Sequence, residues 1–395
     1  MSDIKNMVCG EESNMSKKCV KPHIRFAGFD EEWERRKLMN EVFSIDTGKS
    51  KFTLKTTGNY EILGSTSLIG YDDSYDYEGD FLLTARVGAN AGELYRHSGK
   101  VKISDNTVFI QGQQLDFIYY ALLNFDIKKL SFGTGQPLIK ASELKNQNLL
   151  IPISNSEKEQ ISVYFCNLDR LITLHQNKYD KLTNIKKAML EKMFPKNGAN
   201  VPEIRFKGFS DDWERRKLEE VVDIYDGVHQ TPEYKDSGIM FLSVENITTL
   251  KSNKYISEES FKKDYKVYPQ KGDILMTRIG DVGTPNVVET MEKLAFYVSL
   301  ALLKPTNIES YFLCNAIQSS LFQKRLRDRT LITAIPQKIN KEEIGKIDII
   351  LSTFVQEQRQ IGAFFKQLDK LIALHQKRVE KLQSIKKACI EKMFV

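Results

Sequence analysis

The chain has 395 residues, of which 41% are hydrophobic, and it carries a formal net charge of +6. That length is enough for two ordinary domains with separate cores, and no run of roughly 18 apolar residues predicts a transmembrane helix. The mildly basic balance permits nucleic-acid binding but does not argue for it alone. The N-terminal residues lack the apolar stretch of a secretory signal, so we expect a cytoplasmic protein. The five cysteines form no CxxC pair, which argues against a disulfide framework or a zinc site.

Two long phrases each occur twice, in the same order. PHIRFAGFDEEWERRKL (22–38) returns as PEIRFKGFSDDWERRKL (202–218), with 12 of 17 positions identical. LDRLITLHQNKYDKLTNIKKAMLEKMF (168–194) returns as LDKLIALHQKRVEKLQSIKKACIEKMF (368–394), with 17 of 27 identical. The offset grows from 180 in the first phrase to 200 in the second, so the second copy has gained 20 residues between its matching ends. We therefore expect two modules of one kind with diverged middles, and not a short-period solenoid.

Both middles contain short apolar runs, rich in β-branched and aromatic residues and bounded by Gly, Asp and Ser, which predict strands. In the first middle these strands are expected at 41–49, 80–88, 101–110 and 148–154, with a helix over 115–124. In the second they are expected at 240–248, 273–280, 295–304 and 346–352, with a helix over 309–327. Each middle therefore predicts an α+β domain.

Each copy closes with apolar residues at the spacing of a long helix, beginning near Glu157 and near Glu357. The first would cover 157–194, roughly 57 Å at 1.5 Å per residue, and Pro195 would stop it. One such stripe alone would be an ordinary surface helix packed on its own domain. Because two nearly identical stripes occur, we expect the helices to pack on each other as an antiparallel pair, with the modules at opposite ends of a rod.

These boundaries predict an α+β protein in which two domains of mixed α/β structure are joined by two long antiparallel coiled-coil helices with pseudo-two-fold symmetry. The expected parts are an N-terminal tail (1–21), a first domain (22–156), a first helix with its linker (157–197), a second domain (198–356) and a second helix (357–395).

Motifs of an active site are missing from the sequence. It contains no GxxxxGK[ST], HExxH or GxSxG, and no Asn-Pro-Pro-Tyr motif of an amino-methyltransferase. His175 and His375 recur in the two long helices, where polar packing positions are a simpler interpretation than paired catalytic residues. The acidic run from Asp72 to Asp80 is interpreted as a solvated loop, with a cation site as the alternative. We therefore predict no catalysis, no metal and no cofactor in this chain.

Basic, amide and aromatic side chains recur at corresponding places in both middles, and these suit nucleic acid. Lys and Arg contact phosphates, while Arg, Gln and Asn read base edges. Each residue alone is more often plain solvated surface, but the recurrence in both middles raises the odds of DNA binding. The candidates in the first middle are Tyr71, Tyr75, Arg86, Lys128, Lys129, Gln136 and Lys140. Those in the second are Tyr234, Arg278, Lys324, Arg325, Arg327, Arg329, Gln337 and Lys338.

The order of motifs resembles the specificity subunit of bacterial type I restriction–modification systems, over about Pro22 to Val395. The motifs are P-x-I-R-F-x-G-F…W-x-R-R-K-L, then G-D-[FI]-L in a variable middle, then E…Q-I…L-D-x-L-I-x-L-H-Q in a helix ending E-K-M-F, all present twice. The resemblance implies that each middle is a target-recognition domain for one half of a bipartite double-stranded DNA site. It also implies that the helices set the distance between the half-sites.

The resemblance further implies partners that carry the chemistry. Two modification (methyltransferase) subunits would bring S-adenosylmethionine, and restriction subunits would bring ATP-driven translocation and cleavage. S-adenosylmethionine, ATP and Mg are then expected only in those partners, and this chain would be non-catalytic. One alternative is a coiled-coil scaffold that binds only proteins, which the two diverged middles count against. The other is a self-sufficient nuclease or methyltransferase, which the missing motifs count against.

Overall fold

The structure is a computed structural model, which describes residues 4–6, 21–130 and 137–394. It divides into unit 1, comprising residues 1–175 and 377–395, and unit 2, comprising residues 176–376. Each unit contains one α+β domain, the first part of one long helix and the last part of the other. Within the described ranges, no helix is long and apolar enough to cross a membrane.

The domain of unit 1 is built on a six-stranded sheet in the order β4-β9-β7-β8-β5-β6. Its strands are β4 (Ser44–Thr47), β5 (Tyr60–Leu63), β6 (Leu68–Asp72), β7 (Tyr77–Ala85), β8 (Leu94–Ile103) and β9 (Thr107–Gln111). Two further pairs are β1 (Ile4–Asn6) with β2 (Ile24–Phe26), and β3 (Glu34–Lys37) with β10 (Asn148–Ile151). The helical elements are η1 (Leu38–Asn40), α1 (Leu115–Phe125), η2 (Ile127–Leu130) and α2 (Ala141–Asn146). Apart from β1 and Lys21, the expected tail over 1–21 lies outside the described residues.

The domain of unit 2 has a four-stranded sheet in the order β12-β18-β15-β16 and a separate three-stranded sheet in the order β14-β13-β17. The strands are β12 (Val222–Asp226), β13 (Ile239–Leu242), β14 (Tyr255–Ile256), β15 (Ile274–Ile279), β16 (Asp281–Val287), β17 (Leu294–Phe296) and β18 (Leu300–Pro305). A further pair is β11 (Glu214–Lys217) with β19 (Asp348–Leu351). The helical elements are η3 (Leu218–Glu220), η4 (Val244–Asn246), α4 (Glu258–Asp264), α5 (Ser310–Gln318), α6 (Ser320–Arg329) and α7 (Lys341–Gly345).

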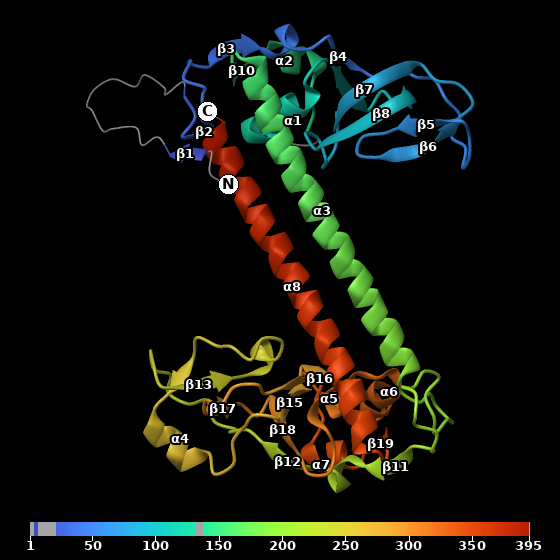
Figure 1. Cartoon of the computed structure of the whole chain (residues 1–395), viewed down its shortest axis with the longest axis vertical. Coiled ribbons are helices and arrows are strands. Elements are labelled where there is room, and N and C mark those ends of the chain that lie inside the picture. The colour runs from blue at the N-terminus through green and yellow to red at the C-terminus, as the bar shows by residue number, and fades with distance from the viewer. Residues whose placement is uncertain (1–3, 7–20, 131–136, 395) are drawn as a thin grey trace. The chain divides into compact units, whose positions relative to one another are not determined.

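The two domains share a four-stranded frame and differ in what is added to it. The strand order β4-β9-β7-β8 in unit 1 matches β12-β18-β15-β16 in unit 2. In unit 1 the frame is extended by β5 and β6, because β5 pairs parallel to β8. In unit 2 the additional strands form their own sheet, beside α4 (Figure 1). The divergence expected of the middles is therefore concentrated in these additions.

The long helices are α3 (Asn155–Lys192) and α8 (Val355–Met393), so the boundaries predicted from spacing are confirmed to within two residues at the start of each helix. They run antiparallel within each unit (Figure 1). In unit 1, Tyr164 contacts Cys389 and Asp169 pairs with Lys386. In unit 2, Lys186 pairs with Asp369, and Phe194 packs on Phe365 with ring centroids 6.0 Å apart. The antiparallel packing expected from the two stripes is confirmed inside both units.

A matching aromatic cluster lies within the main core of each unit. In unit 1, Phe394 from the end of α8 packs on Trp33, Phe117 and Phe165. In unit 2, Phe194 beyond the end of α3 packs on Trp213, Phe312 and Phe365 in the same way. The final Phe of the repeated E-K-M-F motif therefore closes the core of a domain in both copies. Burial of several aromatic side chains supplies much of the stabilising apolar area.

Four sequence expectations were wrong in detail. The strand expected over 240–248 is β13 followed by the 3-10 helix η4, and the strand expected over 295–304 is divided between β17 and β18. The helix expected over 309–327 is two helices, because Ser319 ends α5 and its hydroxyl also caps α6 by accepting from the Phe322 N–H. The strand expected over 101–110 is the end of β8 and all of β9, with a turn between them at 104–106. The last two breaks occur at Ser and Asp-Asn sequences, which favour caps and turns.

Candidate nucleic-acid interface

The repeated opening phrase fastens each domain to the start of its own long helix. In unit 1, Arg25 donates from Nε and Nη2 to the two carboxylate oxygens of Glu157, at 2.6 and 2.8 Å. The indole N–H of Trp33 donates to Glu157 Oε1 at 3.3 Å. Glu157 is only 1% exposed, so these donors supply the hydrogen bonds that its buried carboxylate cannot take from water. We call this arrangement of Arg, Trp and Glu the clamp.

Unit 2 repeats the clamp with Arg205, Trp213 and Glu357. Arg205 donates to both Glu357 oxygens at 2.7 and 2.8 Å, and Trp213 donates at 3.1 Å. The carboxylate of Glu357 is completely buried. A two-pronged bond between a planar guanidinium and a planar carboxylate fixes orientation as well as distance. Each clamp therefore sets how its domain meets its helix.

The frame strands position an arginine and a loop at the same place in both units. Arg86 directly follows β7, and the Ile139 N–H donates to its carbonyl at 2.8 Å. Arg278 lies in β15, and the Ile339 N–H donates to its carbonyl at 3.0 Å. Two residues further along, the Gly88 and Gly280 N–H groups donate to the carbonyls at 137 and 337. The loops before α2 and α7 are thus anchored identically, and they bring several candidate residues together.

In unit 1 the loop before α2 and the neighbouring η2 carry exposed lysines near Arg86. The Arg86 guanidinium donates to the carbonyl of Asp105 at 3.3 Å. Lys128 pairs with Glu93 at 3.4 Å, and Lys140 lies 4.0 Å from Glu143. Lys129 is also exposed, and Gln136 lies outside the described residues. Exposed ion pairs of this kind are weak, so these lysines are free to exchange partners for phosphates.

In unit 2 the corresponding arginine is turned inward. Arg278 is 6% exposed, and its guanidinium lies against the carboxylate of Asp226 at the end of β12. Burial lowers the pKa of Arg278. The exposed residues here are Gln337, whose amide donates to the Gly280 carbonyl at 2.9 Å, and Lys338. In this conformation, Gln337 and Lys338 are accessible to a ligand and Arg278 is not.

The four cations predicted on one helix point in different directions. Arg325 donates to the carbonyl of Asp348 at 2.7 Å, and Arg329 donates to Glu343 at 2.8 Å. Lys324 and Arg327 are exposed on α6. Only part of this basic segment therefore faces solvent, because Phe322 and Leu326 bury the opposite side of α6.

The candidate tyrosines lie on the additions that differ between units. Tyr71 is in β6, and Tyr75 follows it. The ring of Tyr75 is tilted by 52° to that of Tyr60, with centroids 4.9 Å apart, and Lys100 Nζ lies 4.8 Å from the Tyr75 ring centroid. Tyr234 is exposed beside β13, with Lys254 Nζ 5.6 Å from its ring. Aromatic rings beside cations offer stacking and phosphate contacts together. The structure does not bring these tyrosines to the same site within the shared frame.

The sequence reasoning missed a stacked arginine next to α1. Arg96 in β8 lies 3.9 Å from the ring centroid of Tyr119 and 4.9 Å from that of Tyr120, and pairs with Asp116 at 3.2 Å. The Tyr120 hydroxyl donates to Asp169 of α3 at 2.6 Å. Burial, followed by this hydrogen bond, raises the pKa of Tyr120. This network links the sheet to the long helix, and no recurring pattern in the sequence signals it.

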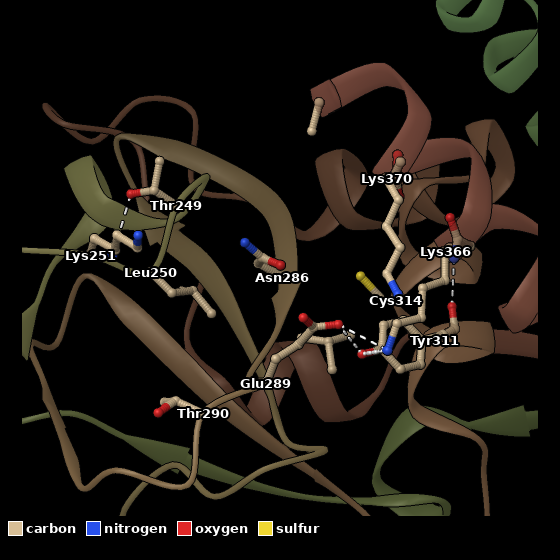
Figure 2. A pocket seen from close by; sticks show the side chains of 14 residues that line it. Thr249, Leu250, Lys251, Asn286, Glu289, Thr290, Tyr311, Cys314, Lys366 and Lys370 are labelled. Carbon is tan, nitrogen blue, oxygen red and sulfur yellow. Dashed lines mark hydrogen bonds and ion pairs between the residues drawn. The ribbon is translucent and has the colours of Figure 1, made fainter. Parts of the chain in front are cut away.

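Unit 2 has a pocket of about 440 Å³ at the matching place (Figure 2). Asn286 corresponds to Arg96 in strand pairing, because it is paired with Leu275 as Arg96 is paired with Leu82, the leucines of the two G-D-[FI]-L motifs. Asn315 holds the position of Tyr120, because each lies three residues after a core phenylalanine, Phe312 or Phe117. Small amides thus replace the large side chains that fill unit 1. The remaining lining comes from α5, α8 and the segments 249–251 and 287–290. Tyr311 and Lys366 both contact the carboxylate of Glu289.

This pocket combines amide oxygens with amino groups. The Asn315 side chain is buried, its Nδ2 donates to the Tyr311 carbonyl at 2.6 Å, and its Oδ1 has no partner among the described residues. Lys370 reaches toward the pocket from α8 (Figure 2). Within the described ranges, this pocket included, no group of three or more His, Cys, Asp or Glu side chains could hold a metal ion. The arrangement suits polar binding and contains no nucleophile–base pair.

Similarity to known proteins identifies the family of the chain. A family model described as the type I restriction modification DNA specificity domain matches residues 30–184 and again residues 210–384. The chain belongs to this family. The two matches coincide with the two copies found in the sequence, so the resemblance based on repeated motifs is confirmed.

Relatives and solved structures agree with the family. The chain is similar to the type I restriction enzyme MjaVIII specificity subunit of Methanocaldococcus jannaschii, with 26% identity over 76% of this chain and 75% of the relative. It is similar to the type I restriction enzyme EcoprrI specificity subunit of Escherichia coli, with 23% identity over 44% of this chain and 43% of the relative. The crystal structure of the type I restriction–modification system S subunit from M. genitalium matches with a TM-score of 0.73 at 17% identity, covering 95% of this chain and 99% of that one. That likeness confirms the α+β fold with its two long helices.

Proposed function

We propose that this specificity-family chain selects the target of a type I restriction–modification complex, each domain reading one half of a bipartite double-stranded DNA site. The observation that carries the proposal is one frame used twice with different additions. The clamp and the strand order β4-β9-β7-β8 recur in unit 2, while the tyrosine-bearing additions do not. A frame that holds two different reading surfaces in the same way suits two different half-sites.

The proposal assigns the gap between half-sites to the long helices. In support, α3 and α8 are continuous over 38 and 39 residues, and both ends of each helix are tied into a domain core. A clamp holds the start of each helix, and Phe194 or Phe394 holds the end. A spacer of fixed length needs such contacts at both ends, because movement of a domain at either end would let the distance between the half-sites vary.

The chemistry is assigned to other subunits. Two modification subunits would dock on the helices and transfer a methyl group from S-adenosylmethionine, and restriction subunits would use ATP and Mg. In support, the sequence contains none of the phosphate-binding, methyl-transfer or hydrolase motifs sought in it. On this proposal the present chain acts by positioning, and takes no part in bond making or breaking.

The test is methylation mapping in cells that carry this chain with its modification subunit. Residues 39–156 are exchanged for the matching segment of a relative, which leaves Arg25, Trp33 and Glu157 of the clamp in place. One half of the methylated motif should change and the other should persist. The matched exchange of 219–356 should change the opposite half. If neither exchange altered the motif while deletion of the chain abolished methylation, the chain would be a protein scaffold and the proposal would fail.

Helix length gives the second test. In unit 2, Lys186 pairs with Asp369, so Leu182 lies near the level of Ala373 on the antiparallel partner. Inserting seven residues, two helical turns, after both positions preserves the apolar stripe and adds about 10 Å. The unspecified gap should lengthen by about three base pairs at about 3.4 Å each. An unchanged gap would show that the helices do not set the spacing.

A further inference from the structure

Three apolar side chains project from one anchored loop of unit 2. Leu331 is half exposed, Ile332 is 71% exposed and Ile335 is fully exposed. We call these three residues the apolar tip. Single exposed aliphatic residues are common on protein surfaces, but a group of them on one loop indicates a contact site.

The loop that carries the apolar tip is held at its base. Leu331 and Lys338 form a bridge in which the Leu331 N–H donates to the Lys338 carbonyl at 2.8 Å. The Gly280 N–H donates to the Gln337 carbonyl at 2.9 Å, and the Gln337 amide donates back to the Gly280 carbonyl at 2.9 Å. The base of the loop is therefore braced by hydrogen bonds, and the side chains of Ile332 and Ile335 remain mostly exposed.

The surroundings of the apolar tip are basic and lie within the candidate DNA surface. Lys338 closes the base of the loop, and Arg327 is exposed on the helix that leads into it. The acidic residues over 324–346 are Asp328, Glu342 and Glu343, and Glu343 is paired with both Arg329 and Lys346. They are outnumbered by the cations of the same segment, Lys324, Arg325, Arg327, Arg329, Lys338, Lys341 and Lys346. Apolar surface framed by free cations complements DNA, where phosphates flank the apolar faces and methyl groups of the bases.

We propose that the apolar tip, through Ile332 and Ile335, makes direct apolar contact with the bases of the half-site read by unit 2. The inference rests on the proposed function and assigns specificity residues within it. Aliphatic side chains that meet thymine methyl groups or lie between base pairs carry sequence information. Lys338 contacts a phosphate beside the two isoleucines and carries no sequence information. Leu331, which forms the bridge with Lys338, is the least exposed of the three and is left unchanged in the test.

The experiment measures DNA binding by the full-length chain assembled with its modification subunits. The variants are Ile332→Ser with Ile335→Ser, and Lys338→Ala for comparison. Met291→Ser is the matched control, because Met291 is an apolar residue of unit 2 that is 83% exposed outside the loop. All four side chains are exposed, so the variants should fold normally. Affinity is measured over a range of salt concentrations for a duplex with the target sequence found by methylation mapping and for a scrambled duplex.

The double isoleucine variant should bind the target roughly 5- to 100-fold more weakly, with unchanged affinity for the scrambled duplex and an unchanged salt slope. Lys338→Ala should weaken both duplexes and reduce the slope by about one. Base changes in the half-site read by unit 2 should reduce the affinity of the double variant less than that of the wild type. Base changes in the other half-site should reduce the affinity of both proteins equally.

Equal weakening on both duplexes would overturn the inference, and so would normal DNA binding with poorer subunit assembly, which would make the apolar tip a protein contact. A wild-type complex that prefers its target, and a double variant that keeps this preference, would overturn the inference alone. A wild-type complex with no preference would overturn the proposed function and the inference together.

Discussion

Replacing Glu357 with glutamine should destabilise unit 2 by about 3 kcal/mol, because it breaks a buried charge pair from one side. The carboxylate accepts three hydrogen bonds, two from Arg205 and one from Trp213. Glutamine has one acceptor oxygen, and its amino group would face the guanidinium. The hydrogen bonding between Arg205 and Glu357 is the largest cause of the raised pKa of Arg205. Arg205 therefore stays charged and would lose its counter-ion.

A double-mutant cycle separates the pair from its desolvation. Arg205→Met alone leaves Glu357 buried without its cation and should cost a similar amount. Arg205→Met combined with Glu357→Met removes both charges, and should cost clearly less than the two single changes added together. The interaction between the two sites should therefore be about 2 kcal/mol or more.

The assay uses the two tryptophans of the chain, one in each clamp. Trp33→Phe leaves Trp213 as a fluorescent reporter of unit 2, and Trp213→Phe leaves Trp33 as a reporter of unit 1. Denaturant unfolding is then followed in each background, with and without Glu357→Gln. The Trp213 transition should shift strongly and the Trp33 transition should not. Glu157→Gln should give the reverse pattern.

Two results would refute this reasoning. A loss below about 1 kcal/mol would place the clamp among exposed ion pairs, which contribute little. Equal losses reported by both tryptophans would show that the clamp stabilises the whole chain and not its own unit.

Three other outcomes are expected. Burial opposes ionisation of Glu41, but hydrogen bonds led by that from Lys158 bring its pKa below the ordinary 4.5. The folded pKa is therefore the lower one, so this stabilisation is present above pH 4.5 and is lost as the pH falls through the folded value; Glu41→Gln should flatten that part of the unit 1 stability profile. Burial raises the pKa of Cys314 to about 12, so mass spectrometry should show it unalkylated by iodoacetamide at pH 8 unless urea is present. Gly227→Ala would place a Cβ 2.5 Å from a backbone carbonyl of β17 and should destabilise unit 2 by about 2 kcal/mol in urea titrations.

The long helices and the frame strands could be predicted because their signals are redundant. A 3.6-residue spacing repeated over about ten turns tolerates individual departures, so α3 and α8 were placed to within two residues at the start of each helix. The runs that became β7 and β15 are continuous apolar segments bounded by glycine, which indicates central strands. Repetition of both signals in the second copy made the two-module architecture secure.

The clamp strands could not be predicted from local residues. β3 and β11 both read ERRK, and such charged residues have low strand propensity. They become strands only because β10 and β19 pair with them from more than 100 residues away along the chain. The ion pairs of the clamps also join residues 132 and 152 positions apart. One usable signal existed: Arg, Trp and Glu recur together in both copies.

The candidate DNA residues show a different limit, which is the direction in which a side chain points. Arg86 and Arg278 hold matching backbone positions, yet one is partly exposed and the other lies against Asp226. Residue type and spacing are the same in both cases. The first strand of each frame has an aspartate at or near its end, yet Asp46 of β4 pairs with Lys49 and Asp226 of β12 meets Arg278. Only the folded structure reveals which partner each side chain takes.

The division between clamp and additions explains how one chain could acquire new targets under the proposed function. Base reading needs side chains held in fixed positions, and a buried two-pronged ion pair supplies orientation even where its net stabilisation is small. The clamp residues lie at the two ends of each domain sequence, outside the segments 39–156 and 219–356. An exchange of everything between them therefore changes the reading surface and preserves the way it is mounted. The 17-residue phrase is repeated because both domains must be mounted alike, whatever each one reads.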